Sequence, residues 1–220
     1  GFYARRSARI WPIYLLFVAA GFLATVAIRH EQPYPELLSF LFFYNNLQAA
    51  FAHGTFDIPA LGGGHLWTIS TEMQFYAVYG VAFILLPRRI VVGLLAACLV
   101  VSPVLRLAAA LLLADAGLTS SRAAYAIYAV SFLHFDAFAA GALIALSLGW
   151  ARRHCRRLLL AGVTVFGTYC IVYVLVNVTV RGATGVAAFQ NIVSGILFGQ
   201  FREVFLYSAL ALLFSGIVAM

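Results

Sequence analysis

The sequence that decides the fold reads His65-Leu66-Trp67-Thr68-Ile69-Ser70-Thr71-Glu72-Met73-Gln74-Phe75-Tyr76, and it opens an apolar run that continues to Leu86. An ionised carboxylate near the centre of a bilayer costs roughly 2.5 to 3.5 kcal/mol on insertion scales, so such groups usually face a bundle interior, a water-filled cavity or a ligand. At about 100° per residue, one helical stripe carries His65, Thr68, Ile69, Glu72, Tyr76 and Tyr79. The stretch therefore predicts a membrane helix whose polar groups share one face.

The composition is that of a membrane protein with several spans. Of 220 residues, 64% are apolar and 10% are charged, which leaves too few polar residues to cover a soluble domain. The net charge of +7 comes from 14 basic residues, all arginines, and most lie in short clusters between apolar runs. This pattern is typical of cytoplasmic loop anchors and argues against nucleic-acid binding. The cysteines, Cys98, Cys155 and Cys170, have no ligand spacing, so we expect neither disulfides nor a metal site.

The hydropathy pattern predicts an all-α, polytopic transmembrane helical bundle of about seven spans. The expected spans cover residues 10–28, 66–87, 90–113, 123–149, 158–177, 186–200 and 203–220. A further segment, residues 37–51, either crosses the membrane or is re-entrant or interfacial. The second topology is favoured, because it places residues 5–9, 88–89, 152–157 and Arg202 on the cytoplasmic side. Residues 29–64 then form a long outer loop above the helix that carries Glu72.

Two arginine clusters have two interpretations each. Arg6 and Arg9, at positions i and i+3, would present two guanidinium groups on one helical face at the membrane surface, and such a pair suits phosphate. Ordinary topology anchoring explains the same residues. The cluster at 152–157 has the same ambiguity, with anchoring or contact with lipid head groups favoured.

A second polar intrusion, His134-Phe135-Asp136, interrupts the predicted span 123–149. On a regular helix, His134 and Asp136 lie about 200° apart, so they are not expected to face the same cavity. Asp136 either pairs with a neighbouring arginine such as Arg106, which neutralises buried charge, or has a functional role.

Three segments resemble the acyltransferase 3 family of integral membrane acyltransferases, which modify cell-surface glycans and related hydroxyl-bearing molecules. Residues 2–14 are similar to the family's Arg-x-x-Arg signature followed by Ile-x-Pro-x-Tyr, with Arg6 and Arg9 as the arginine pair. Residues 65–76 are similar to its His-x-Trp-Ser-Leu-Ser-Val-Glu-x-Gln-Phe-Tyr signature, with Thr68 at the first serine. Residues 135–143 resemble, more weakly, the later Arg-x-Asp segment and small-residue helix.

The resemblance implies a membrane-embedded O-acyltransferase that moves an acyl group, expected to be acetyl, from cytoplasmic acyl-CoA to a hydroxyl of a cell-surface glycan or similar acceptor. It implies a multi-pass protein of a bacterial inner or plasma membrane, with acyl-CoA as co-substrate and no permanently bound cofactor. Candidate residues for the donor phosphates are Arg6, Arg9 and Arg5. Candidate catalytic residues are Glu72 and His65, and candidates along the substrate path are Trp67, Ser70, Tyr76 and Asp136.

The family typically carries an essential histidine on a helix before the arginine signature. Residues 1–220 are therefore expected to be a single domain that is the middle part, about seven spans, of a ten-span domain. Two alternatives stay open. A secondary transporter or proton-linked carrier would use Glu72, His134 and Asp136 as a relay across the bilayer. The third possibility is a truncated remnant without catalytic activity.

Overall fold

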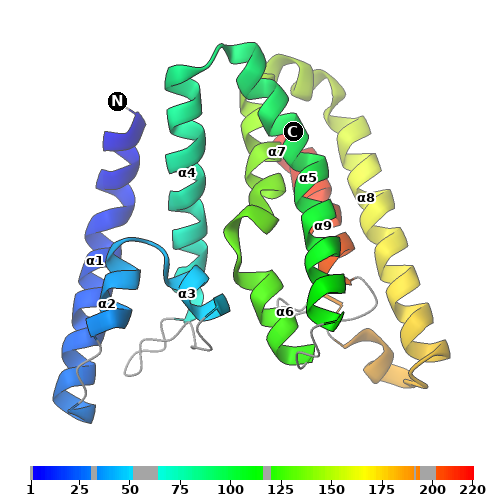
Figure 1. Ribbon diagram of the computed structural model, residues 1–220. Coiled ribbons are helices and arrows are strands. Elements are labelled where there is room, and N and C mark those ends of the chain that lie inside the picture. The colour runs from blue at the N-terminus through cyan, green and yellow to red at the C-terminus, as the bar shows by residue number, and fades with distance from the viewer. Residues whose placement is uncertain (1, 31–33, 52–63, 116–119, 191, 194–201) are drawn as a thin grey trace. The chain divides into compact units, whose positions relative to one another are not determined.

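The structure is a computed structural model that describes residues 2–30, 34–51, 64–115, 120–190, 192–193 and 202–220 (Figure 1). Every regular element in these ranges is a helix, so the all-α prediction is confirmed. The chain divides into two compact units. The first unit contains Gly1–Pro87 and Ala129–Phe132, and the second contains Arg88–Tyr128 and Leu133–Met220.

The first unit is built on two long antiparallel helices, α1 and α4. Its elements are α1 (Phe2–Arg29), α2 (Tyr34–Leu41), α3 (Asn45–Phe51), the 3-10 helix η1 (Gly64–Leu66) and α4 (Trp67–Leu85). The Tyr3 hydroxyl donates to the Tyr76 carbonyl at 3.1 Å, whereas the Phe17 ring meets the His65 ring with centroids 5.8 Å apart. The start of α1 thus contacts the middle of α4, and a later residue of α1 contacts η1 just before α4, which defines the antiparallel register.

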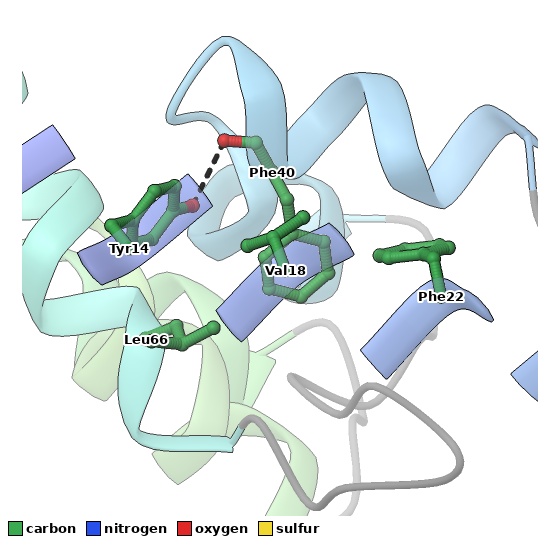
Figure 2. Packing of buried hydrophobic residues seen from close by; sticks show 5 residues of the cluster. All are labelled: Tyr14, Val18, Phe22, Phe40 and Leu66. Carbon is green, nitrogen blue, oxygen red and sulfur yellow. Dashed lines mark hydrogen bonds between the residues drawn. The ribbon is translucent and has the colours of Figure 1, made fainter. Parts of the chain in front are cut away.

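An apolar cluster joins α2 to α1. Tyr14, Val18 and Phe22 follow one another at four-residue spacing on α1 and pack with Phe40 and Leu66 (Figure 2). The Tyr14 hydroxyl donates to the Phe40 carbonyl at 2.8 Å, which satisfies both polar groups inside this core (Figure 2).

The ambiguous segment 37–51 is not one spanning helix. Phe43 has a positive φ of 56°, and the turn it makes separates α2, with 8 residues, from α3, with 7. A membrane span needs about 20 residues, so neither helix is long enough to cross alone. This break agrees with the re-entrant or interfacial interpretation.

The second unit contains α5 (Arg88–Asp115), most of α6 (Ser120–Ala129), the end of the 3-10 helix η2 (Ser131–His134), α7 (Phe135–Leu146), α8 (Leu148–Thr179), the 3-10 helix η3 (Gly185–Phe189) and α9 (Arg202–Val218). Helices α8 and α9 are antiparallel and closely packed, because Gly162 lies against Leu213 while Gly216 lies against Leu159. A Cβ atom built on either glycine would come within 2.5 Å of the facing Cα atom.

Among the described residues, three helical stretches are long and apolar enough to cross a membrane: Tyr3–Ile28, Arg88–Leu113 and Leu148–Thr179. They support a membrane protein, but seven spans are not confirmed. Helix α4 has 19 residues, and polar side chains in its first half make it less apolar than these three. Helix α9, with 17 residues, is slightly short of the usual length.

The predicted continuous span 123–149 is wrong, because the helix breaks between α6 and α7. At the end of α6 the carbonyls accept hydrogen bonds from side chains: Asn46 donates to Ala129 at 2.9 Å, and a ring nitrogen of His134 lies 3.1 Å from the Ile127 carbonyl. These bonds replace the helical bonds that would otherwise satisfy the carbonyls in an apolar environment.

The predicted span 186–200 is also not borne out. Residues 185–189 form the 3-10 helix η3, and residues 191 and 194–200 lie outside the described residues. Because α9 is antiparallel to α8, it begins at the end of the unit where α8 finishes. Arg202 therefore lies at the end opposite to Arg152–Arg157, not beside them as predicted. Helix α8 begins at Leu148 rather than 158, so this cluster lies within a helix instead of a loop.

Candidate functional site

Arg6 of α1 and Glu72 of α4 meet in the first unit, although 66 positions separate them in the sequence. Their closest charged atoms, Nη1 and Oε1, are 3.8 Å apart. The Tyr76 hydroxyl donates a short hydrogen bond to the same Oε1, and the Arg6 guanidinium lies 4.9 Å from the centre of the Tyr76 ring. The antiparallel register of α1 and α4 thus joins three of the residues predicted from the two signatures.

The contact between Arg6 and Glu72 is loose and partly open to the surroundings. A distance of 3.8 Å exceeds the 2.7 to 2.9 Å typical of charge-assisted hydrogen bonds, and the two side chains are 39% and 29% exposed. Exposed ion pairs of this kind contribute little to stability. The guanidinium is therefore able to engage an added anion, while Glu72 keeps its hydrogen bond from Tyr76.

Two further arginines lie on the same turns of α1 as Arg6. Arg5 and Arg9 are both exposed. Among the arginines of this cluster, only Arg6 has an ion-pair partner within the described parts of the chain. Glu72 lies 13 residues, or about 20 Å of helical rise, before Leu85 at the end of α4. The cluster thus lies beside the body of α4, not level with its final turn.

The opposite side of α4 is used for packing. Ser70 is fully buried and donates to the side-chain oxygen of Asn45, and the Gln74 amide donates to the side-chain oxygen of Asn46 at 3.0 Å. Asn46 also donates to Ser131 at 2.6 Å. Ser70, predicted to lie along a substrate path, is therefore part of a buried polar network that holds α3 and residues 129–132 against α4.

Sequence reasoning missed Asn45, Asn46 and Ser131 as members of this network. The signal that could have found them is the Asn45-Asn46 pair itself, since two consecutive amides in an apolar segment of a membrane protein need partners on neighbouring helices. Nothing in the sequence pairs those amides with Ser70, Gln74 and Ser131.

The placement of His65 corrects the predicted stripe. Helix α4 begins at Trp67, so His65 belongs to η1. It therefore does not continue the helical stripe that carries Glu72 and Tyr76. His65 is exposed and lies against Phe17 of α1. Trp67 is partly buried at the start of α4, where its carbonyl accepts the Thr71 hydroxyl at 3.1 Å.

Asp136 belongs to the second unit and is paired with Arg106, as one of the two interpretations predicted. Two parallel contacts join them, Nη1 to Oδ1 at 3.1 Å and Nη2 to Oδ2 at 2.6 Å, and the side chains are 0% and 3% exposed. Arg106 also donates to the Leu133 carbonyl and to the Ser208 hydroxyl, the latter at 2.8 Å. These contacts compensate the burial of both charges.

The prediction that His134 and Asp136 cannot face one cavity is wrong. Both residues line a cavity of about 270 Å³ in the second unit. The prediction assumed one regular helix, whereas His134 ends the 3-10 helix η2 and Asp136 lies in the first turn of α7. The change of helix type between them alters the angle that separates their side chains.

No family model, curated protein or solved structure matches the chain. Within the described ranges, no group of three or more His, Cys, Asp or Glu side chains is arranged to hold a metal ion. Where Arg6, Glu72 and Tyr76 meet, the groups present are a carboxylate, a phenol and a guanidinium ion.

Proposed function

We propose that the chain is part of a membrane-embedded O-acyltransferase that resembles the acyltransferase 3 family. It moves an acyl group, expected to be acetyl, from acyl-CoA to a hydroxyl of a cell-surface glycan or a similar acceptor. The observation that carries this proposal is the contact of Arg6 with Glu72 and Tyr76. This contact brings the two signature segments together, although they resemble the family independently of each other.

The proposed reaction needs a proton acceptor and an anion site. The acceptor hydroxyl oxygen attacks the thioester carbonyl carbon, a C–O bond forms, the C–S bond breaks, and the hydroxyl proton ends on the departing thiolate. In the proposed assignment, Arg6 and Arg9, with Arg5, bind the donor phosphates. An imidazole first accepts the hydroxyl proton. This imidazole belongs either to His65 or to the histidine on a preceding helix that the resemblance implies. Glu72 would orient the histidine of that preceding helix and stabilise its charged form.

The loose geometry of the ion pair supports these two roles. Arg6 and Glu72 neutralise each other at 3.8 Å, and phosphate would compete for the same guanidinium. Glu72 would keep the Tyr76 hydroxyl as a donor and gain freedom to accept from an imidazole. The carrier alternative has less support, because it needs Asp136 in a proton relay, whereas Asp136 is held by two contacts from Arg106.

Binding of coenzyme A by the full-length protein in detergent tests the proposal. We expect coenzyme A to bind, the combined Arg6→Ala and Arg9→Ala variant to lose that binding, and Arg181→Ala, which removes an exposed arginine of the second unit, to keep it. Arg6→Lys keeps the positive charge, but we expect it to reduce acyl transfer, because an ammonium group cannot form a bidentate fork with phosphate. Unchanged binding in the double alanine variant, or near-normal transfer by Arg6→Lys, would reduce these arginines to topology anchors.

A further inference from the structure

Six arginines gather at one end of the second unit. Arg88 and Arg89 begin α5, and the Arg88 guanidinium donates to the Leu146 carbonyl at 2.8 Å, which brings the start of α5 to the end of α7. Helix α8 begins two residues later and carries the other four arginines in its first turns. We name these four residues the arginine stripe: Arg152, Arg153, Arg156 and Arg157.

The arginine stripe has a strong positive charge, and in the part of the chain that the structure describes none of its four arginines forms a salt bridge. Its four side chains are exposed, and on a regular helix they span an arc of about 140° within about 7.5 Å of rise. The sequence contains no Asp or Glu from residue 137 to residue 202. Four like charges this close repel one another, and a bound anion would relieve the repulsion.

Aromatic and capping groups at the same end match a membrane interface. Trp150 is 50% exposed and stacks on His154, with ring centroids 4.6 Å apart. Tryptophan is enriched at this depth, where its ring meets the head groups. The Ser147 hydroxyl donates to the Leu143 carbonyl at 2.6 Å and forms no capping hydrogen bond with α8. In the most apolar window of α8, 11% of the residues are buried against the described parts of the chain, which leaves most of this apolar surface for contact with lipid.

A mainly apolar cavity begins at this end and follows α7 inward. Its volume is about 300 Å³, and we name it the α7 cavity. It extends from Ser147 and Trp150 to Asp136, a distance of about 16 Å along α7 for 11 residues, and α9 forms its opposite wall. Leu143, Ile144 and Leu158 are among the apolar lining residues. The lining of the α7 cavity includes none of the four arginines, but Trp150 lines it and lies two residues before Arg152 on α8, so the apolar slot and the arginine stripe share the same end of the unit.

We propose that this corner binds an anionic diacyl phospholipid, with its phosphate on the arginine stripe and one acyl chain in the α7 cavity. Charge complementarity selects the head group, since juxtamembrane arginines attract anionic lipids. The acyl chain of the bound lipid would fill the apolar α7 cavity, which would otherwise be empty between α7 and α9. The inference is independent of the acyl-transfer proposal, because it uses residues of the second unit only.

Lipid binding by the full-length protein in detergent tests this site, with phosphatidylglycerol compared with phosphatidylcholine of the same chains. Native mass spectrometry gives the bound lipid, and the shift of the thermal unfolding midpoint gives the stabilisation. We expect phosphatidylglycerol to be retained and to raise the midpoint. The variant with all four arginines of the stripe changed to glutamine should bind it at least roughly tenfold more weakly. Arg181→Gln, an exposed arginine near the other end of α8, should change nothing.

A matched pair of variants tests the cavity. Ala140 lines the α7 cavity and Ala137 lines the neighbouring one, both on α7. Ala140→Phe should weaken phosphatidylglycerol binding, whereas Ala137→Phe should not. Equal retention of both lipids, full binding by the glutamine variant, or equal effects of the two phenylalanine variants would overturn the proposal. Stabilisation by inorganic phosphate or coenzyme A that matched that of phosphatidylglycerol would also overturn it, because the ligand would then not be a lipid.

Discussion

Glu72 and Asp136 are both acidic residues in an apolar protein, yet their surroundings differ in the ways that decide function. Asp136 is fully enclosed and bound by Arg106 through both oxygens, so both charges are neutralised permanently. Glu72 is 29% exposed, has a loose contact with Arg6 and accepts a short bond from Tyr76. The first arrangement is typical of a structural pair, and the second leaves the carboxylate able to change partners.

We expect Glu72→Gln in the full-length protein to reduce acyl transfer by roughly tenfold to a hundredfold without loss of folded protein. The amide keeps an oxygen that accepts from Tyr76 but cannot stabilise a charged imidazole. Arg6 is 39% exposed, so it tolerates the loss of its partner. The measurement is activity per folded molecule. Full activity would remove Glu72 from the mechanism, and loss of folded protein would make it a structural partner.

The buried pair should behave in the opposite way. Asp136→Ala leaves Arg106 buried without its partner, and breaking such a pair costs about 3 to 5 kcal/mol, so we expect little folded protein. The double change Arg106→Met with Asp136→Leu should recover part of the lost stability, because it removes both charges. The thermal unfolding midpoint in detergent measures this. A well-folded Asp136→Ala protein with no fall in that midpoint would contradict the structural role.

At the scale of helices, close packing depends on residues that composition does not single out. Hydropathy predicted α8 and α9, but not that Gly162 and Gly216 let their backbones approach until a Cβ atom would overlap the facing helix. Glycines that allow such approach are typical of helix pairs in membranes. Gly167, on the same helix α8, has open space around its Cβ position and provides a matched control.

We therefore expect Gly162→Ala to destabilise the protein by about 1 to 3 kcal/mol, because the methyl group meets backbone atoms of Leu213 that cannot rotate away. Gly167→Ala should be neutral or slightly stabilising, since alanine is the better helix former. Thermal unfolding of the two variants in the same detergent makes the comparison. Equal midpoints for Gly162→Ala and Gly167→Ala would show that α8 and α9 are not closely packed in solution.

The sequence predicted the helical class and the long helices, and the pairing of Asp136 with Arg106 was one of its two interpretations of Asp136. All three follow from the cost of placing polar groups in lipid. It did not predict where helices break. The break between α6 and α7 depends on Asn46 and His134, whose partners at Ala129 and Ile127 are known only after folding. The first site also needed the register of α1 against α4, which no local pattern contains, to join Arg6 with Glu72.

For the whole molecule, helix directions within the second unit constrain the topology. The contact of Arg88 with Leu146 places the start of α5 and the end of α7 at one end, which is also where α8 begins. Helix α9 is antiparallel to α8, so Val218 finishes at that same end. If the arginines there are cytoplasmic, as charge bias predicts, Val218 is cytoplasmic too. The seven-span arrangement would instead put Val218 on the outer side.

Cysteine labelling in intact cells separates the two arrangements. In full-length protein with Cys98, Cys155 and Cys170 replaced, we introduce Gly149→Cys, Val180→Cys or Val218→Cys, all at exposed positions. We expect an impermeant maleimide to label Val180→Cys from outside, and to label the other two only after the membrane is permeabilised. Gly149 and Val180 report the two ends of α8, so they calibrate the sides independently of α9. Labelling of Val218→Cys from outside, together with Val180→Cys, would mean that the connection from α8 to α9 crosses the membrane and that the antiparallel packing of these helices is wrong.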